Sequence, residues 1–270
     1  MSSTPRIRVG IGGWNFAPWR DNFYPAGWPQ ARELEYAAQH VTAIEVNSTY
    51  YSAQKPATYA KWRDAAPEGF VFSLKASRYA TQKRVLAEAG ESIERFIGSG
   101  IAELGDKLGP IVWQLAPTKV FDEEDLSRFF ALLPGAVGGL PLRHALEVRH
   151  ASFASPDYVA LARRFGVTTV FTDALDRFPV IADPTGSFVY ARLLSADSGM
   201  PTGYAPEVLD RWAVAARHWA EGGVDADLPR VAPSLQPAGQ PQDVFVYFIN
   251  GAKERAPAAA MALLQRLRLP

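Results

Sequence analysis

The chain has 270 residues, of which 48% are hydrophobic and 21% charged, so it can bury a large core and has the composition of an ordinary globular domain. Its 28 basic residues balance 28 acidic residues, which disfavours a dedicated nucleic-acid-binding protein because such proteins usually carry a basic excess. Cysteine is absent, and this excludes disulfide bonds, thiolate nucleophiles and metal sites built on cysteine.

Short β-rich segments alternate with helical segments along the whole chain. The predicted strands, in chain order, are residues 7–13, 43–49, 70–76, 110–116, 144–150, 168–173, 188–193 and 244–250. The predicted helices between and after them are residues 28–39, 57–65, 91–108, 123–132, 157–165, 206–221 and 257–267. This alternation is typical of parallel strands joined by right-handed crossovers. Eight such units at this length predict an α/β fold with a single (β/α)8 barrel, the TIM barrel.

The alternative fold is an open, doubly wound sheet. Residues 10–14 (Gly-Ile-Gly-Gly-Trp) end the first predicted strand, but they lack the G-x-G-x-x-G spacing of a dinucleotide site. These glycines therefore carry little weight for either fold, and the number of units favours the closed barrel.

Two connections depart from a regular barrel. Only residues 174–187 separate the sixth and seventh predicted strands, and Pro179 and Pro184 within them indicate that the sixth helix is short or missing. Residues 222–242 are rich in Pro, Gly and Ala and predict a long, mobile loop on the N-terminal face of the barrel. With a flexible tail at residues 1–6 and no internal linker, residues 1–270 form one predicted domain.

The sequence also bears on the cellular location. No apolar run approaches the length of a membrane-spanning helix, and the residues before the first strand have no signal-peptide core. We therefore expect a cytoplasmic protein without membrane contact; the sequence leaves the oligomeric state open.

Polar side chains recur at the ends of the predicted strands. Residues two apart on a strand share a face, so Glu45 and Asn47 oppose Ile44 and Val46. Equivalent alternation in the other strands places a polar set on the inner face, near the C-terminal mouth where barrels of this kind hold their active sites. The strand residues predicted to point inward are Glu45, Asn47, Ser73, Lys75, Gln114, Glu147, Arg149, Asp173, Arg192 and Asn250.

Within and around this set we assign candidate roles by side-chain chemistry. Carboxylates and an amine can transfer protons, whereas guanidinium, amide and aromatic groups can hold an anion or stack on a sugar ring. The candidate catalytic residues are Glu45, Lys75, Glu147 and Asp173. The candidate substrate-binding residues are Trp14, Asn47, Gln114, Arg149, His150, Arg192, Tyr204 and Asn250.

Two other interpretations of the same charges stay open. The three acids and three bases could neutralise one another as a structural ion-pair network. One histidine, His150, together with Glu45, Glu147 and Asp173, could instead bind Mg²⁺ or Mn²⁺. We expect no cofactor and no metal, because a hydrolytic metal site usually needs several histidines and carboxylates at one spot and only His150 lies at a strand end. No P-loop, His-Glu-x-x-His motif or nucleophile elbow is present.

Several segments together resemble the YecE-like family (DUF72), whose members have a TIM-barrel fold and no established reaction. The similarity is carried by Gly12-Gly13-Trp14 with Trp19 and residues 23–25, by residues 45–51 (Glu-Val-Asn-Ser-Thr-Tyr-Tyr), 72–75, 114–117, 147–150 (Glu-Val-Arg-His) with Phe153, and 247–250. Two family histidines are missing: residues 79–81 lack the His of a Thr-His pair, and Leu193-Leu194 replaces a His-Gly pair. If those histidines transfer protons in the family, this chain has lost that activity or uses His150.

Three functions compete on these residues. The leading hypothesis is an enzyme that acts on a small polar or anionic metabolite, such as a sugar or sugar phosphate, by acid–base chemistry. Glycoside hydrolysis by paired carboxylates and a Schiff base at Lys75 are variants of it. The second hypothesis is a ligand-binding or regulatory barrel without turnover, and the third, least favoured, is a nucleic-acid-processing protein.

Overall fold

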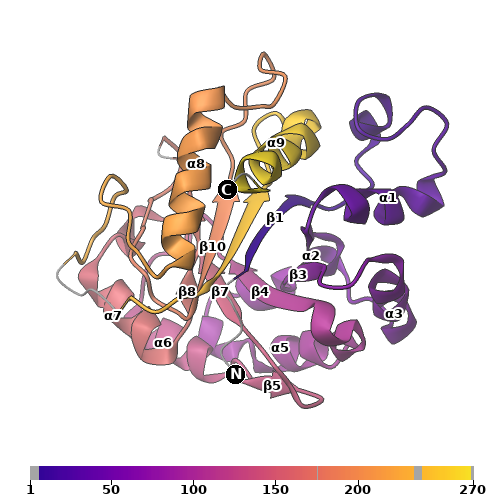
Figure 1. Ribbon diagram of the computed structural model, residues 1–270. Helices are drawn as coiled ribbons and strands as arrows, with labels where there is room; N and C mark the ends of the chain where they lie inside the picture. The colour runs from indigo at the N-terminus through magenta and orange to yellow at the C-terminus, as the bar shows by residue number, and fades with distance from the viewer. Residues whose placement is uncertain (1–5, 175, 234–238, 269–270) are drawn as a thin grey trace.

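The computed structural model describes residues 6–174, 176–233 and 239–268 (Figure 1). Its main sheet is entirely parallel, in the order β8-β7-β4-β3-β2-β1-β11-β10-β9. The strands are β1 (Ile7–Gly12), β2 (Ala43–Val46), β3 (Val71–Lys75), β4 (Leu108–Gln114), β7 (His144–Glu147), β8 (Thr168–Thr169), β9 (Phe171–Thr172), β10 (Phe188–Leu193) and β11 (Asp243–Phe248). These positions confirm the eight predicted strands, since β8 and β9 are two parts of the sixth.

The sixth strand closes the barrel by changing partner. Thr168 and Thr169 pair with Ala145 and Leu146 of β7, whereas the residues beyond Val170 pair with Ala191 and Arg192 of β10. The two ends of the sheet are therefore joined through a five-residue segment, which confirms the TIM barrel and excludes the open sheet.

Helices surround the barrel (Figure 1). They are α1 (Glu33–His40), α2 (Ser48–Tyr51), α3 (Pro56–Ala65), α4 (Arg78–Thr81), α5 (Gly90–Ile97), α6 (Glu123–Ala131), α7 (Pro156–Phe165), α8 (Pro206–Ala220) and α9 (Ala256–Arg268). Ser155 caps α7 by accepting from Tyr158 N–H, and Gly166 ends this helix in the left-handed region (φ 65°), where glycine meets no steric penalty. None of the helices in the described ranges is both long and apolar enough to cross a membrane.

One predicted helix was wrong in its extent, and one hairpin was not predicted. The helix predicted at residues 91–108 is interrupted: after α5 the chain turns at Gly100 (φ 108°) into a 3-10 segment, Ile101–Lys107. A Cβ atom at Gly100 would approach the Cα of Pro56 to 2.7 Å, so this turn, with its positive φ, requires glycine. A short antiparallel hairpin, β5 (Ala136–Val137) and β6 (Leu140–Pro141), was also missed.

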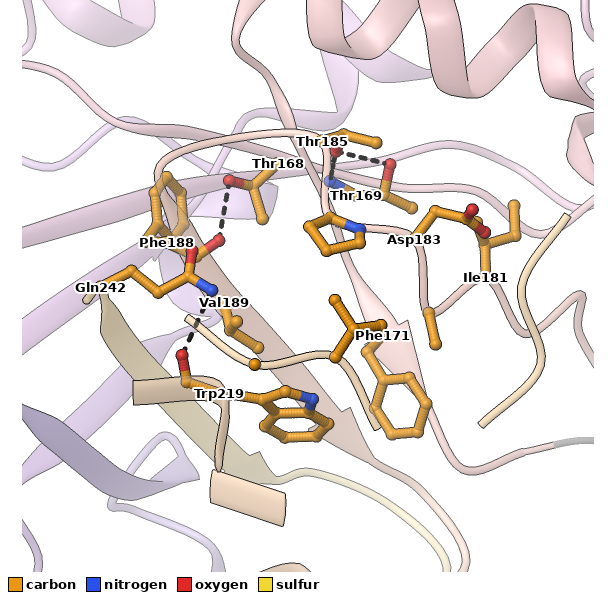
Figure 2. Close-up of a pocket in the computed structure, with 14 residues that line it drawn as sticks. Thr168, Thr169, Phe171, Ile181, Asp183, Thr185, Phe188, Val189, Trp219 and Gln242 are labelled. Atoms are coloured by element: carbon orange, nitrogen blue, oxygen red, sulfur yellow. Dashed lines mark hydrogen bonds between the residues drawn. The ribbon is translucent and has the colours of Figure 1, made fainter. Parts of the chain in front are cut away.

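The described residues between β9 and β10 form no helix, as the two prolines predicted. Part of the space is filled by residues 181–185, where Thr185 accepts from Thr169 N–H (Figure 2). The Thr185 hydroxyl also donates to Val167 C=O. The cavity left beside them is only about 30 Å³, which accommodates a water molecule but no metabolite.

Residues 222–233 fold over the same gap. The buried carboxylate of Asp183 accepts from Val231 N–H (2.7 Å) and Ala232 N–H (3.0 Å), so this stretch is attached to the β9–β10 connection. Residues 234–238 lie outside the described residues, and the mobility predicted for 222–242 stays a prediction. The predicted tail at 1–6 lies outside them as well, apart from Arg6, whose backbone N–H donates to Asp243.

Candidate functional site

The barrel interior has an apolar lower part and a charged layer at the C-terminal ends of the strands. The lower part is filled by inward side chains, including Val71, Val112, Phe245 and Tyr247. Above them, Glu45, Glu147 and Arg192 are almost completely buried. Because unpaired charges at this depth would be strongly destabilising, their hydrogen bonds decide what the layer can do.

Arg192 is the centre of this layer. Its guanidinium donates to both oxygens of Glu45, from Nε and from Nη2, each over 2.9 Å. Its Nη1 donates to Glu147 Oε2 and, over 3.3 Å, to Gln114 Oε1. The Tyr190 hydroxyl also donates to Glu45 Oε2 over 2.8 Å. One arginine from β10 thus joins the ends of β2, β4 and β7.

Arg149 extends the layer toward solvent. Its Nε donates to Glu147 Oε1 over 2.6 Å and its Nη2 to Gln114 Oε1 over 3.0 Å, while its guanidinium lies 4.5 Å from the Phe178 ring. Burial alone would raise the pKa of Glu147, but the charges of Arg192 and Arg149 outweigh it and hold that pKa below its usual value. Glu147 is therefore a paired carboxylate rather than a proton donor near neutral pH.

Lys75 has a different environment. Its side chain is 9% exposed and comes from the end of β3; its Nζ lies 4.3 Å from the centre of the Tyr50 ring. Burial, followed by the charge of Arg192, lowers the pKa of Lys75 to about 8, although Glu45 and Glu147 oppose this. Lys75 is thus an amine at the mouth that is partly neutral at mildly alkaline pH.

A second lysine at the mouth, Lys253, was missed as a site residue. Its Nζ lies 4.7 Å from the Phe16 ring and 5.8 Å from the Trp19 ring, and Trp19 Nε1 donates to its backbone C=O over 2.9 Å. Burial lowers the pKa of Lys253, and the charge of Glu45 partly offsets this. Lys253 begins a 3-10 turn (Lys253–Arg255) after β11, and side-chain alternation along strands cannot place such a residue.

The structure puts Asp173 outside the charged layer, contrary to its predicted inward orientation. Phe171 packs on the outer helix residue Trp212, and Asp173, two residues on, has the same outward direction. Its carboxylate accepts from Leu194 N–H (2.6 Å) and from the Tyr204 hydroxyl (2.8 Å). Asp173 and Tyr204 therefore form a separate pair that ties together the loops after β9 and β10.

Asn250 also fails to point inward: it is exposed and lies beyond β11. The inner face of β11 is occupied by Phe245 and Tyr247, and Ile249 follows just beyond the strand. Val246 and Phe248 belong to the outer core. Both faces of this strand are apolar, so alternation had no polar face to identify.

The remaining predicted binding residues lie near the mouth. Within the described residues, the hydrogen bonds of Asn47 and His150 go to groups other than the charged side chains of the Arg192 layer. Asn47 donates to Glu45 C=O over 3.3 Å. Trp14 packs edge-on against Trp62, with ring centres 5.3 Å apart. His150 Nδ1 accepts from Ser152 N–H and caps the following 3-10 turn, which leaves its Nε2 for other contacts.

The positions of the carboxylates test whether they could bind a divalent metal ion together. Asp173 is separate from the two glutamates, and each glutamate is held by an arginine. In the ranges the structure describes, no three His, Asp or Glu side chains gather as a candidate metal site. The arrangement does not fit the Mg²⁺ or Mn²⁺ site considered above, and the absence of a cofactor stays a prediction.

Comparisons with known proteins agree with the resemblance seen in the sequence. The YecE protein of Escherichia coli (strain K12) is 26% identical over 120 residues, covering 44% of this chain and 42% of YecE. The YunF protein of Bacillus subtilis (strain 168) is 24% identical over 157 residues, covering 56% of this chain and 54% of YunF. The chain thus aligns with about half the length of these curated relatives.

The similarity in fold to solved structures covers more of the chain than these sequence alignments do. The crystal structure of a DUF72 family protein from Thermotoga maritima MSB8 has a TM-score of 0.74 at 20% identity, covering 97% of this chain and 99% of that chain; at this identity the likeness shows the fold alone. The sequence profile of the family described as "Protein of unknown function DUF72" matches residues 8–270. The chain therefore belongs to the DUF72 family.

Proposed function

We propose that this protein is an enzyme acting on a small anionic metabolite, of sugar or sugar-phosphate type, with the Lys75 amine as its reactive group. The observation that carries the proposal is the environment of Lys75, a buried lysine at the C-terminal mouth whose pKa is lowered to about 8. An amine of this kind can take a proton from a substrate or attack a carbonyl carbon.

The two glutamates have a different part in this proposal. Glu45 and Glu147 are held in charge-assisted hydrogen bonds to Arg192 and Arg149, so their oxygens are already occupied by guanidinium donors. They fix the electrostatic potential around Lys75 instead. This revises the catalytic role that the sequence suggested for both residues.

The charge of the mouth supports an anionic substrate. The layer and its rim contain four basic groups, Lys75, Arg149, Arg192 and Lys253, and two carboxylates, Glu45 and Glu147. The two lysines and the half-buried Arg149 are the groups a phosphate or carboxylate could reach, since Arg192 is enclosed. Arg149 and Lys253 would hold the anion while Lys75 reacts.

The test uses pyridoxal 5′-phosphate as an anionic aldehyde reagent at pH 8. The amine of Lys75 adds to the aldehyde carbon and loses water to give an imine, which borohydride reduces to a stable secondary amine. We expect peptide mass spectrometry to find Lys75 labelled well before the exposed Lys61. Pyridoxal, which lacks the phosphate, should react more slowly, and inorganic phosphate should protect.

Two results would contradict the proposal. One is labelling of Lys75 no faster than that of Lys61. The other is equal labelling by the phosphorylated and unphosphorylated aldehydes, which would remove the anion from the argument.

The complete pairing of Glu45 and Glu147 with arginines favours one second candidate, a ligand-binding barrel without turnover. This second candidate predicts that phosphate still slows labelling of the lysines at the mouth, while Lys75 reacts with the aldehyde no faster than an exposed lysine. The labelling experiment therefore separates the two candidates.

A further inference from the structure

The missing sixth helix leaves a second cavity on the outside of the barrel. Its volume is about 450 Å³, within the range of small-molecule sites. It lies between β9, the N-terminal half of α8 and residues 225–229. The small cavity of about 30 Å³ lies next to it, toward the N-terminal ends of the strands, and Figure 2 shows Phe171 among the residues that line that small cavity. Phe171 also lines the larger outer cavity.

The floor of this outer cavity is apolar and aromatic. Phe171 and Trp212 are buried and lie edge to face, with ring centres 5.6 Å apart. Val180, Val208 and Leu228, each half-buried, form the walls. Such a surface favours a ligand with an aromatic or alkyl body, which would be removed from water on binding.

The polar groups around the floor are predominantly acidic. Asp173, Asp225 and Asp227 line the cavity, against one base, Arg211. The three carboxylates are not gathered closely enough for a metal ion within the part of the chain that the structure describes. Asp173 is already engaged by Leu194 N–H and the Tyr204 hydroxyl. Asp225 and Asp227, which lie on one loop, give the cavity a negative edge above an apolar floor.

We propose that this cavity is a second binding site, specific for a small organic cation with an apolar body, such as an aryl-alkyl ammonium compound. The charge complementarity is opposite to that of the mouth, where basic groups are in excess. The proposal is thus independent of the reaction at Lys75.

Binding is measured by calorimetry with three probes of similar shape: 2-phenylethylammonium, 2-phenylethanol and 3-phenylpropionate. We expect the cation to bind more tightly than the neutral alcohol and the anion to bind least. Because a partly exposed charge pair contributes about 0.5–1 kcal/mol, Asp225→Asn and Asp227→Asn should each weaken binding of the cation by about two- to fivefold. Val208→Trp, which fills the cavity, should abolish binding of both cation and alcohol.

Two controls locate the site. Glu207→Gln removes an exposed carboxylate from the same helix outside the cavity, and Lys75→Gln alters the mouth; both should leave the affinity unchanged. Tighter binding of 3-phenylpropionate, full affinity in the two Asp variants, or loss of affinity in the Lys75 variant would each overturn the proposal. The absence of any binding by 2-phenylethylammonium would overturn it as well.

Discussion

At the scale of single residues, burial of the charged Lys75 amine should make the folded protein less stable at neutral pH than at pH values where this amine is neutral. Its pKa of about 8 lies below the ordinary value of 10.5, so between these values the unfolded chain binds more protons and stability rises with pH. The shift corresponds to about 3 kcal/mol. We expect Lys75→Met to be more stable than wild type at pH 7, with the difference vanishing as the pH approaches 10.5.

Chemical denaturation at several pH values measures this difference. The exposed Lys61→Met is the matched control and should show no pH-dependent gain. A Lys75→Met protein that is less stable at pH 7, or whose difference from wild type does not change with pH, would contradict the environment described for Lys75.

Replacing Glu147 should have the opposite effect to replacing Lys75: it should destabilise the fold. It is enclosed between Arg192 and Arg149. Removing the charge of Glu147 takes away the carboxylate that Arg149 pairs with and leaves the buried Arg192 with Glu45 alone. We expect Glu147→Gln to cost about 3 kcal/mol or more in the free energy of unfolding. In Glu124→Gln, which breaks an exposed pair with Arg128, the cost should stay below about 0.5 kcal/mol; similar small losses in both variants would leave Glu147 as a solvated, unpaired group.

At the scale of elements, the β9–β10 connection takes over the place of the missing helix. Its stability should depend on Asp183, which binds two backbone N–H groups of the segment 222–233. Asp183→Ala leaves those donors unsatisfied, at about 1–3 kcal/mol, and should expose Arg230 to trypsin. The exposed Asp176→Ala is the control, and unchanged cleavage at Arg230 would show that other contacts hold the segment.

At the scale of the whole molecule, an anion bound at the mouth should stabilise the fold by mass action. Phosphate at ten times its dissociation constant adds about 1.4 kcal/mol, which corresponds to a rise in Tm of about 3–5 °C for a domain of this size. Arg149→Gln and Lys253→Gln should each reduce the rise, whereas Arg95→Gln, on the exposed surface, should not. A full rise in both mouth variants would place the anion elsewhere.

The sequence alone determined the fold and much of the charged layer. The strand–helix alternation depends on local patterns, and the inward direction of Glu45, Glu147 and Arg192 follows from alternation along strands with one polar face. The same rule failed for Asp173, because the outer face of β9 meets Trp212, and for Asn250, because β11 is apolar on both faces.

Only the tertiary structure decided which charges are paired. Arg192 and Glu45 are 147 residues apart in sequence, yet they share two hydrogen bonds of 2.9 Å, and no local pattern specifies such a contact. The same holds for Lys253, brought to the mouth by a loop, and for the outer cavity, which exists because residues 225–229 lie beside β9 and α8. The sequence predicts which polar side chains lie at the ends of the strands. Their pairing and their pKa values depend on burial and on neighbours that folding brings from distant parts of the chain.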